Sequence, residues 1–169
     1  MRKRRNFVEG AAYHITSRTN NKVRIFEQRI GQRIMLLVLA EAKKKFGFRL
    51  ANFCVMPTHI HLLIIPGLGT NPAGIMHWIK MKSSKFWNSV HGSSGHIWGN
   101  RYFAGEIRTA ENYRLVMDYI DNNPIKAGLS RYKGEYPASG AYYIRNNRGD
   151  FVDYDDFARI PYTAQFLLA

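Results

Sequence analysis

The sequence predicts an α+β fold of the ferredoxin-like type, a βαββαβ antiparallel sheet with two helices on one face and one additional C-terminal helix. Short runs of β-branched and aromatic residues alternate along the chain with longer segments whose apolar residues recur at helical spacing. Two of the strand-like runs are separated by only two residues, which favours a hairpin. The face of the sheet opposite the two helices is therefore left for the last helix and for function.

The first half of the chain supplies three strands and one helix. The stretch "AAYHITSR" (11–18) alternates as a strand does and ends at the "TNNK" turn. A helix is expected over residues 26–46, with Gly47 as its C-cap. Its apolar positions at helical spacing are Phe26, Ile30, Ile34, Leu37, Val38 and Ala42. The runs "FRLANFCVM" (48–56) and "HIHLLII" (59–65) then pair as an antiparallel hairpin across "PT".

The second half supplies the remaining elements. A helix is expected over residues 72–91, opened by Asn71 and Pro72, and a Gly/Ser-rich loop separates it from a strand in "RYFAGEIRT" (101–109). A third helix is expected over residues 110–123, where Pro124 should end it. No repeat or linker interrupts this order, so we expect one domain over residues 1–169, with a core at about 10–130 and a tail at 131–169 packed on it.

Composition limits the class of partner and the cellular location. The chain has 25 Lys and Arg against 12 Asp and Glu, a net charge of +13, which indicates a polyanion such as nucleic acid or, less often, an anionic membrane. No apolar run is long enough to span a membrane, and "MRKRRNF" lacks the apolar segment of a secretory signal, so a cytoplasmic protein without a membrane partner is expected. The single cysteine, Cys54, excludes an internal disulfide and is expected in the core.

Two histidines stand in the most apolar stretch of the chain, "MPTHIHLLIIP" (56–66). His59 and His61 should emerge on the same face of a strand with nearly parallel rings, where two imidazoles can share a divalent ion. The alternative, a chance pair of hydrogen-bonded structural histidines, stays open on spacing alone. A histidine-triad hydrolase is excluded, because the third alternating position is Leu63.

The last expected helix separates two tyrosines. An apolar stripe runs along it through Tyr113, Val116, Met117 and Ile120, so Tyr113 should belong to the core. Tyr119 lies about a third of a turn off this stripe, with Asn123 beside it on the same flank. A boundary tyrosine before an Asn-Asn-Pro helix stop is the alternative interpretation.

Three separated motifs, "MPTHIHLLIIP", "WGNRYFAGEIR" and "YRLVMDYIDNNPIKAGL", resemble the single-tyrosine HUH transposases, in particular their REP-associated branch, over residues of about 10–130. The resemblance implies that His59 and His61 are ligands of Mg²⁺ or Mn²⁺ and that Tyr119, on a C-terminal catalytic helix, is the nucleophile. Asn123 occupies the position of a further polar ligand, although Asn in place of Gln leaves direct coordination open. The implied activity is metal-dependent cleavage and strand transfer of single-stranded, hairpin-forming DNA through a 5′-phosphotyrosine intermediate.

Several side chains outside these motifs are candidates for DNA binding. Trp98 and Tyr102 are candidates for stacking on bases, with a core position for Trp98 as the alternative. The candidates for phosphate contact, with a solvated charged surface as the alternative, are Arg2, Lys3, Arg4, Arg5, Lys80, Lys82 and Lys85.

Two other functions stay open at this stage. A replication initiator or conjugative relaxase of the HUH class would use the same chemistry, but the Asn-Pro motif after a single tyrosine favours the transposases. A catalytically silent module that binds nucleic acid through a ferredoxin-like sheet is the second alternative. The sequence leaves open whether the protein is a monomer or a homodimer and whether Tyr119 serves its own metal site or a partner's.

Overall fold

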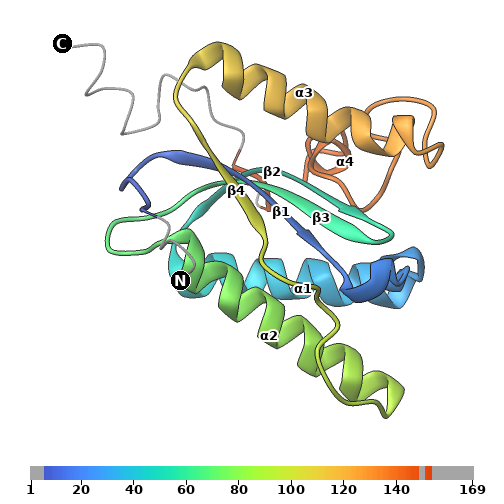
Figure 1. Cartoon of the computed structure of the whole chain (residues 1–169). Coiled ribbons are helices and arrows are strands. Elements are labelled where there is room, and N and C mark those ends of the chain that lie inside the picture. Colours follow the sequence, from blue (N-terminus) through green and yellow to red (C-terminus); the bar gives the residue numbers. More distant parts are fainter. Residues whose placement is uncertain (1–5, 149–150, 154–169) are drawn as a thin grey trace.

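The computed structural model describes residues 6–148 and 151–153. A four-stranded antiparallel sheet of order β2-β3-β1-β4 lies between α3 on one face and α1 and α2 on the other (Figure 1). The strands are β1 (Ala12–Arg18), β2 (Arg49–Met56), β3 (His59–Ile65) and β4 (Phe103–Ile107), and the helices are α1 (Arg29–Phe46), α2 (Pro72–His91), α3 (Ala110–Lys126) and α4 (Gly140–Arg145). This arrangement confirms the predicted α+β, ferredoxin-like class.

The two central strands carry a different kind of side chain on each face. On β1, Tyr13, Ile15 and Ser17 are buried, while His14, Thr16 and Arg18 on the other face are at least partly accessible. Antiparallel pairing sets Thr16 opposite His61 of β3, so these two side chains project from the same face of the sheet. That face is the one that α3 covers, because Tyr119 of α3 contacts the His61 ring.

The helix predicted from residue 26 begins later, at Arg29. Gln28 has an extended backbone, and Phe26 lies before it in a short 3-10 turn, η2 (Ile25–Glu27). The Phe26 ring is buried beside Trp98 with ring centroids 5.4 Å apart, so it fills the core from the turn rather than from the helix. The predicted C-cap is confirmed, because Gly47 adopts the left-handed conformation with φ of 62°.

The last long helix passes the residue that was expected to end it. Pro124 lies inside α3, which continues to Lys126. A proline there removes one backbone hydrogen bond close to the C-terminus of the helix, where few bonds follow. Asn122 and Asn123 donate their side-chain amides to carbonyls four residues earlier, which supports the last turns.

Part of the segment after residue 130 packs against β2. Tyr136, Ala138 and Val152 are buried in the same core as the sheet, and Asp153 pairs with Lys43 of α1. The single-domain boundary at 1–169 stays a prediction, because residues 154–169 lie outside the described part. Cys54 is fully buried, as expected.

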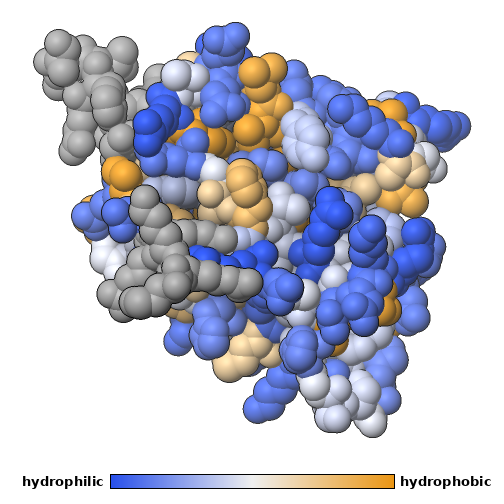
Figure 2. Space-filling model, in the orientation of Figure 1, coloured by the Kyte–Doolittle hydropathy of each residue, from blue (hydrophilic) through white to orange (hydrophobic). Residues whose placement is uncertain are grey.

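The outer surface carries many of the charged residues that the sequence contains. The face seen in Figure 2 is mostly hydrophilic, with hydrophobic groups scattered between charged and polar ones. Within the described residues, no helix is long and apolar enough to cross a membrane.

Candidate active site

The predicted histidine pair lies at the start of β3, directly after the two-residue turn of Pro57 and Thr58. His61 is buried and His59 is half-buried, and both project toward α3. Their ring centroids are 4.9 Å apart, but the rings are nearly perpendicular, at 83°, and not parallel as the spacing suggested. Each ring turns toward a different hydrogen-bond partner, which accounts for the difference.

Those partners occupy the Nδ1 atom of each imidazole. Nδ1 of His59 lies 3.0 Å from the Thr58 hydroxyl oxygen, and Nδ1 of His61 lies 3.1 Å from that of Thr16. Nε2 of His61 is buried and has no hydrogen-bond partner within the described part of the chain. When Nδ1 carries the proton and donates it, Nε2 keeps a free lone pair, which is the arrangement that metal-binding histidines use.

A third histidine, His14 on β1, completes the cluster and was not predicted. Its Nε2 lies 3.1 Å from Nδ1 of His61, and the two rings stack with centroids 5.3 Å apart. The sequence held a usable signal, because a ferredoxin-like order sets the first strand beside the third. An alternating histidine on the first strand can then reach the histidine pair.

The environment keeps all three imidazoles neutral near pH 7. Burial lowers the pKa of His14, and burial together with the charge of Arg18 lowers the pKa of His59. Burial, followed by the neighbouring charges of His59, His14 and Arg18, lowers the pKa of His61 to about 3. A neutral imidazole is the form that binds a metal ion.

Tyr119 lies above this cluster on α3. Its ring centroid is 5.3 Å from that of His61 and 5.7 Å from that of His14, and its side chain is 44% exposed. The Lys126 ammonium lies 5.8 Å from the centre of the same ring. The tyrosine that was predicted to lie off the apolar stripe therefore lies over the histidines and stays open to solvent.

The rotation of α3 that directs Tyr119 toward the sheet is fixed by its other side chains. Tyr113 and Ile120 are buried, which confirms the predicted stripe, and the Asn52 amide of β2 donates to the Asp121 carboxylate at 2.8 Å. Burial raises the pKa of Asp121 despite this bond. Asn123 lies one turn after Tyr119 and donates its amide to the Tyr119 carbonyl at 2.7 Å.

The side chains of the cluster could hold a metal ion only in an open site. No group of three His, Cys, Asp or Glu side chains in the described residues is arranged around one point as a metal site. Nε2 of His14 is directed to His61 instead of to a shared centre. The residues therefore fit an open site with two imidazole ligands, supported by the unpartnered buried Nε2 of His61 and completed by groups from outside the protein.

Most predicted DNA contacts have other roles among the described residues. Trp98 was proposed to stack on bases, but it is only 2% exposed, and its indole donates to the Ser83 hydroxyl inside the core. Lys80 donates to the carbonyls of Gly99 and Asn100 and so fixes that loop. These contacts correct the prediction for Trp98 and give Lys80 a structural role.

The other candidates for DNA binding are at least partly accessible or lie outside the described residues. Lys82 pairs with Glu41 and lies over the rings of Trp78 and Phe86, whereas Lys85 is exposed. Tyr102 is half-buried and lines a cavity of about 640 Å³ along α2. The basic residues Arg2, Lys3, Arg4 and Arg5 lie outside the described part of the chain.

An antiparallel sheet with paired histidines beneath a helix-borne tyrosine is the arrangement expected of a tyrosine transposase. The family model described as IS200-like transposase matches residues 7–123, and the chain belongs to this family. It is 25% identical over 173 aligned residues to the REP-associated tyrosine transposase of Escherichia coli (strain K12), with 93% of this chain and 96% of that protein covered. A solved structure of a REP-associated tyrosine transposase bound to a REP hairpin matches with a TM-score of 0.72 and 21% identity, over 93% of this chain and 94% of that one.

Proposed function

We propose that this transposase cleaves and rejoins single-stranded DNA through a covalent bond to Tyr119. The observation that carries the proposal is the Tyr119 ring, accessible to solvent and 5.3 Å from the ring of His61, whose buried Nε2 has no partner in the described chain. An accessible phenol beside an available metal ligand supplies both a nucleophile and a position for the phosphate.

The reaction follows from these groups. The Tyr119 hydroxyl releases its proton to water and its oxygen attacks a backbone phosphorus, forming a bond while the bond from phosphorus to the 3′ oxygen breaks and that oxygen takes up a proton from water. The departing strand leaves with a 3′ hydroxyl, and the protein keeps a 5′-phosphotyrosine. Attack by another 3′ hydroxyl reverses the step and releases Tyr119, so a strand can be joined without ATP.

His59 and His61, with Asn123 as a further ligand, would hold the Mg²⁺ or Mn²⁺ that the family resemblance implies. Such an ion, when bound, polarises the phosphate and offsets the negative charge that develops during transfer. The neutral state of both imidazoles at pH 7 favours this role. Hairpin-forming DNA is the proposed substrate, because the related REP-associated transposase was solved with a REP hairpin.

The test compares two tyrosines of α3 by removing a single oxygen from each. The protein is incubated with Mn²⁺ and hairpin-bearing single strands, and covalent adducts are resolved by denaturing electrophoresis and mapped by mass spectrometry. Tyr119→Phe should abolish the adduct while DNA binding persists. Tyr113→Phe, at a buried position, should still form it.

Three results would each contradict all or part of the proposal. An adduct mapped to another residue would show that the nucleophile is misassigned. DNA binding by the wild-type protein without any adduct would favour the catalytically silent module instead. Preference for a replication origin over hairpin-bearing strands would indicate an initiator or relaxase.

A further inference from the structure

A cavity of about 460 Å³ lies between the end of β1 and the start of β4, beside the histidine cluster. Thr16 and Arg18 line it from β1. The Thr16 hydroxyl is also 3.1 Å from Nδ1 of His61, so the cavity and the cluster share a residue. A volume of this size falls within the range of about 300–1,000 Å³ that is typical of small-molecule sites and suits a nucleotide.

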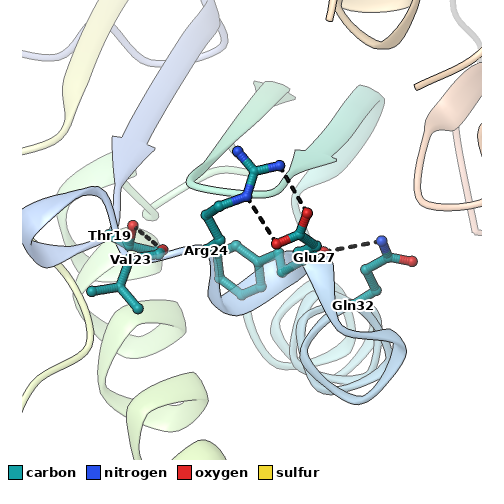
Figure 3. A network of polar contacts seen from close by, with 6 residues as sticks. Thr19, Val23, Arg24, Glu27 and Gln32 are labelled. Atoms are coloured by element: carbon teal, nitrogen blue, oxygen red, sulfur yellow. Dashed lines mark hydrogen bonds and ion pairs between the residues drawn. The ribbon is translucent and has the colours of Figure 1, made fainter. Parts of the chain in front are cut away.

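Hydrogen bonds hold one wall of the cavity, formed by residues 18–22. The Thr19 hydroxyl donates to the Val23 carbonyl at 2.7 Å and lies 3.0 Å from the Thr58 carbonyl; Figure 3 shows the first of these bonds. Farther along the chain, an ion pair between Arg24 and Glu27 occupies the segment that leads to α1 (Figure 3). These contacts support the observed shape of the wall.

The opposite wall, formed by residues 99–103, is attached to the first. The Gly99 amide donates to the Arg18 carbonyl at 2.9 Å, and the Asn20 amide donates to the Ile97 carbonyl at 2.9 Å. The Lys80 ammonium of α2 donates to the Gly99 and Asn100 carbonyls. Lys80 thus holds the backbone directly before Arg101 in place.

The turn at the end of the first wall has an unusual backbone. Asn21 and Lys22 both have positive φ, at 49° and 55°, and neither is glycine. A lysine in this conformation is uncommon, and backbone strain of this kind concentrates at binding sites, where the surrounding structure imposes it. Here it accompanies a turn whose Asn21 and Lys22 both line the cavity.

The charge of the lining is entirely positive. Arg18, Lys22 and Arg101 line the cavity, and no acidic residue does. Among the described residues, none of these three forms an ion pair, whereas Arg24, Lys82 and Arg131 elsewhere are paired with glutamates. Three cations without a carboxylate around a preformed cavity favour an anion, and guanidinium groups suit phosphate oxygens.

An exposed aromatic ring lies at the same cavity. Phe103 at the start of β4 is 60% exposed, although it lines the cavity and contacts the edge of His14 with ring centroids 6.3 Å apart. A side chain at Gly105 would come within 3.1 Å of the Phe103 ring, so the glycine lets this ring lie against the strand. Its remaining surface is available to a planar group.

We propose that this cavity binds the nucleotide next to the reacting phosphate. Arg18, Lys22 and Arg101 contact its phosphate, and Phe103 stacks on its base. The inference rests on the proposed function, since it assigns the cavity to the strand that Tyr119 cleaves. It adds a DNA-binding position at the edge of the sheet, beside the histidines, to the α2 lysines expected from the sequence.

Binding is measured in a Tyr119→Phe background, which should not cleave, by fluorescence anisotropy with two labelled probes: oligothymidylate and an abasic strand of equal length. Arg18→Gln and Arg101→Gln should each weaken binding of both probes about tenfold or more. Each should also reduce the slope of log affinity against log salt by about 1. Lys44→Gln, at an exposed position on α1, is the control and should change neither quantity.

The aromatic contact has its own test. Phe103→Leu should weaken the binding of oligothymidylate and leave that of the abasic strand unchanged, whereas Phe103→Trp should retain both. If the arginine and phenylalanine variants bind both probes as the parent does, the cavity is not a nucleotide site. The proposed function is judged separately by the Tyr119 adduct of the wild-type protein, so an adduct together with unaffected binding would overturn the cavity assignment alone.

Discussion

Nε2 of His14 lies 3.1 Å from Nδ1 of His61, and the two rings are stacked at an interplanar angle of 22°. The Thr16 hydroxyl lies at the same 3.1 Å distance from that Nδ1. Two groups of β1 therefore hold the orientation of the most buried histidine of the site through its Nδ1 atom, without taking its Nε2 atom. His14 is thus a positioning residue for His61.

Removing His14 should weaken metal binding. Partners that orient a metal-binding histidine typically contribute about 10–100-fold in affinity, so His14→Ala should weaken Mn²⁺ binding by that order. Isothermal titration calorimetry without DNA measures the effect directly. His77→Ala, an exposed histidine on α2, is the control. Equal Mn²⁺ affinity in His14→Ala and wild type would show that Thr16 alone is sufficient.

Replacing His61 by leucine should stabilise the metal-free protein. The buried Nε2 has no partner in the described chain, and an unsatisfied buried polar group costs about 1–3 kcal/mol. Leucine removes this group and keeps much of the volume, so thermal unfolding of His61→Leu should occur several degrees higher in chelator. A lower Tm would show that the Nδ1 contacts stabilise the fold more than the Nε2 atom destabilises it.

The same variant should lose its response to metal. A ligand that binds only the folded state raises Tm, so Mn²⁺ should stabilise the wild-type protein. His61→Leu should gain little from Mn²⁺, because one of the two imidazole ligands is absent. A similar gain in both proteins would place the ion elsewhere.

Asp121→Asn should raise stability at neutral pH. Because burial raises the pKa of the folded carboxyl above its unfolded value, Asp121 favours folding below the unfolded pKa, and this contribution is lost as pH rises through the folded pKa. An asparagine keeps an acceptor for the Asn52 amide without a buried charge. Chemical denaturation should therefore show a more stable variant at pH 7 and no difference at strongly acidic pH.

Asp118→Asn provides the matched control for this measurement. Asp118 is exposed and pairs with Lys133, and such surface pairs contribute only about 0–1 kcal/mol. Its removal should leave stability unchanged or slightly reduced at pH 7. A stabilisation equal to that of Asp121→Asn would attribute the effect to net charge instead of burial.

Binding of single-stranded DNA should weaken steeply with salt. With a net charge of +13, several phosphates should be neutralised and their counterions released. The dissociation constant of oligothymidylate, measured with the Tyr119→Phe protein over a series of NaCl concentrations, gives the slope. Affinity that does not depend on salt would exclude these contacts.

The fold was predictable where a pattern is local. Alternation in β1, the short apolar run of β3 and helical spacing in α2 depend only on neighbouring residues, and these elements lie where the sequence indicated. The starts and ends that depend on distant partners were wrong. Phe26 leaves the helical pattern to pack on Trp98, which is far away in sequence. Pro124 is tolerated because it comes close to the end of its helix.

The candidate site was likewise predictable where a local pattern determines which face of an element a side chain occupies. The strand period alone set His59 and His61 on one face, and the helical wheel alone separated Tyr119 from Tyr113. His14 was missed because its role depends on which strand neighbours β3 and in what register. The glycine- and serine-rich loop left Trp98 open between base stacking and a core position, and a bridge to Thr19 and a bond to Ser83 place it in the core.

The alternation along β1 has a consequence for how such a protein can diversify. We expect substitutions at the buried Tyr13, Ile15 and Ser17 to act on folding, and substitutions at His14, Thr16 and Arg18 to act on the proposed metal site and the proposed nucleotide cavity. The requirements of folding and of the proposed site therefore act on adjacent residues of the strand, but on different ones. A lineage could therefore alter its proposed contacts to DNA at Arg18 and Phe103 while inheriting its scaffold intact.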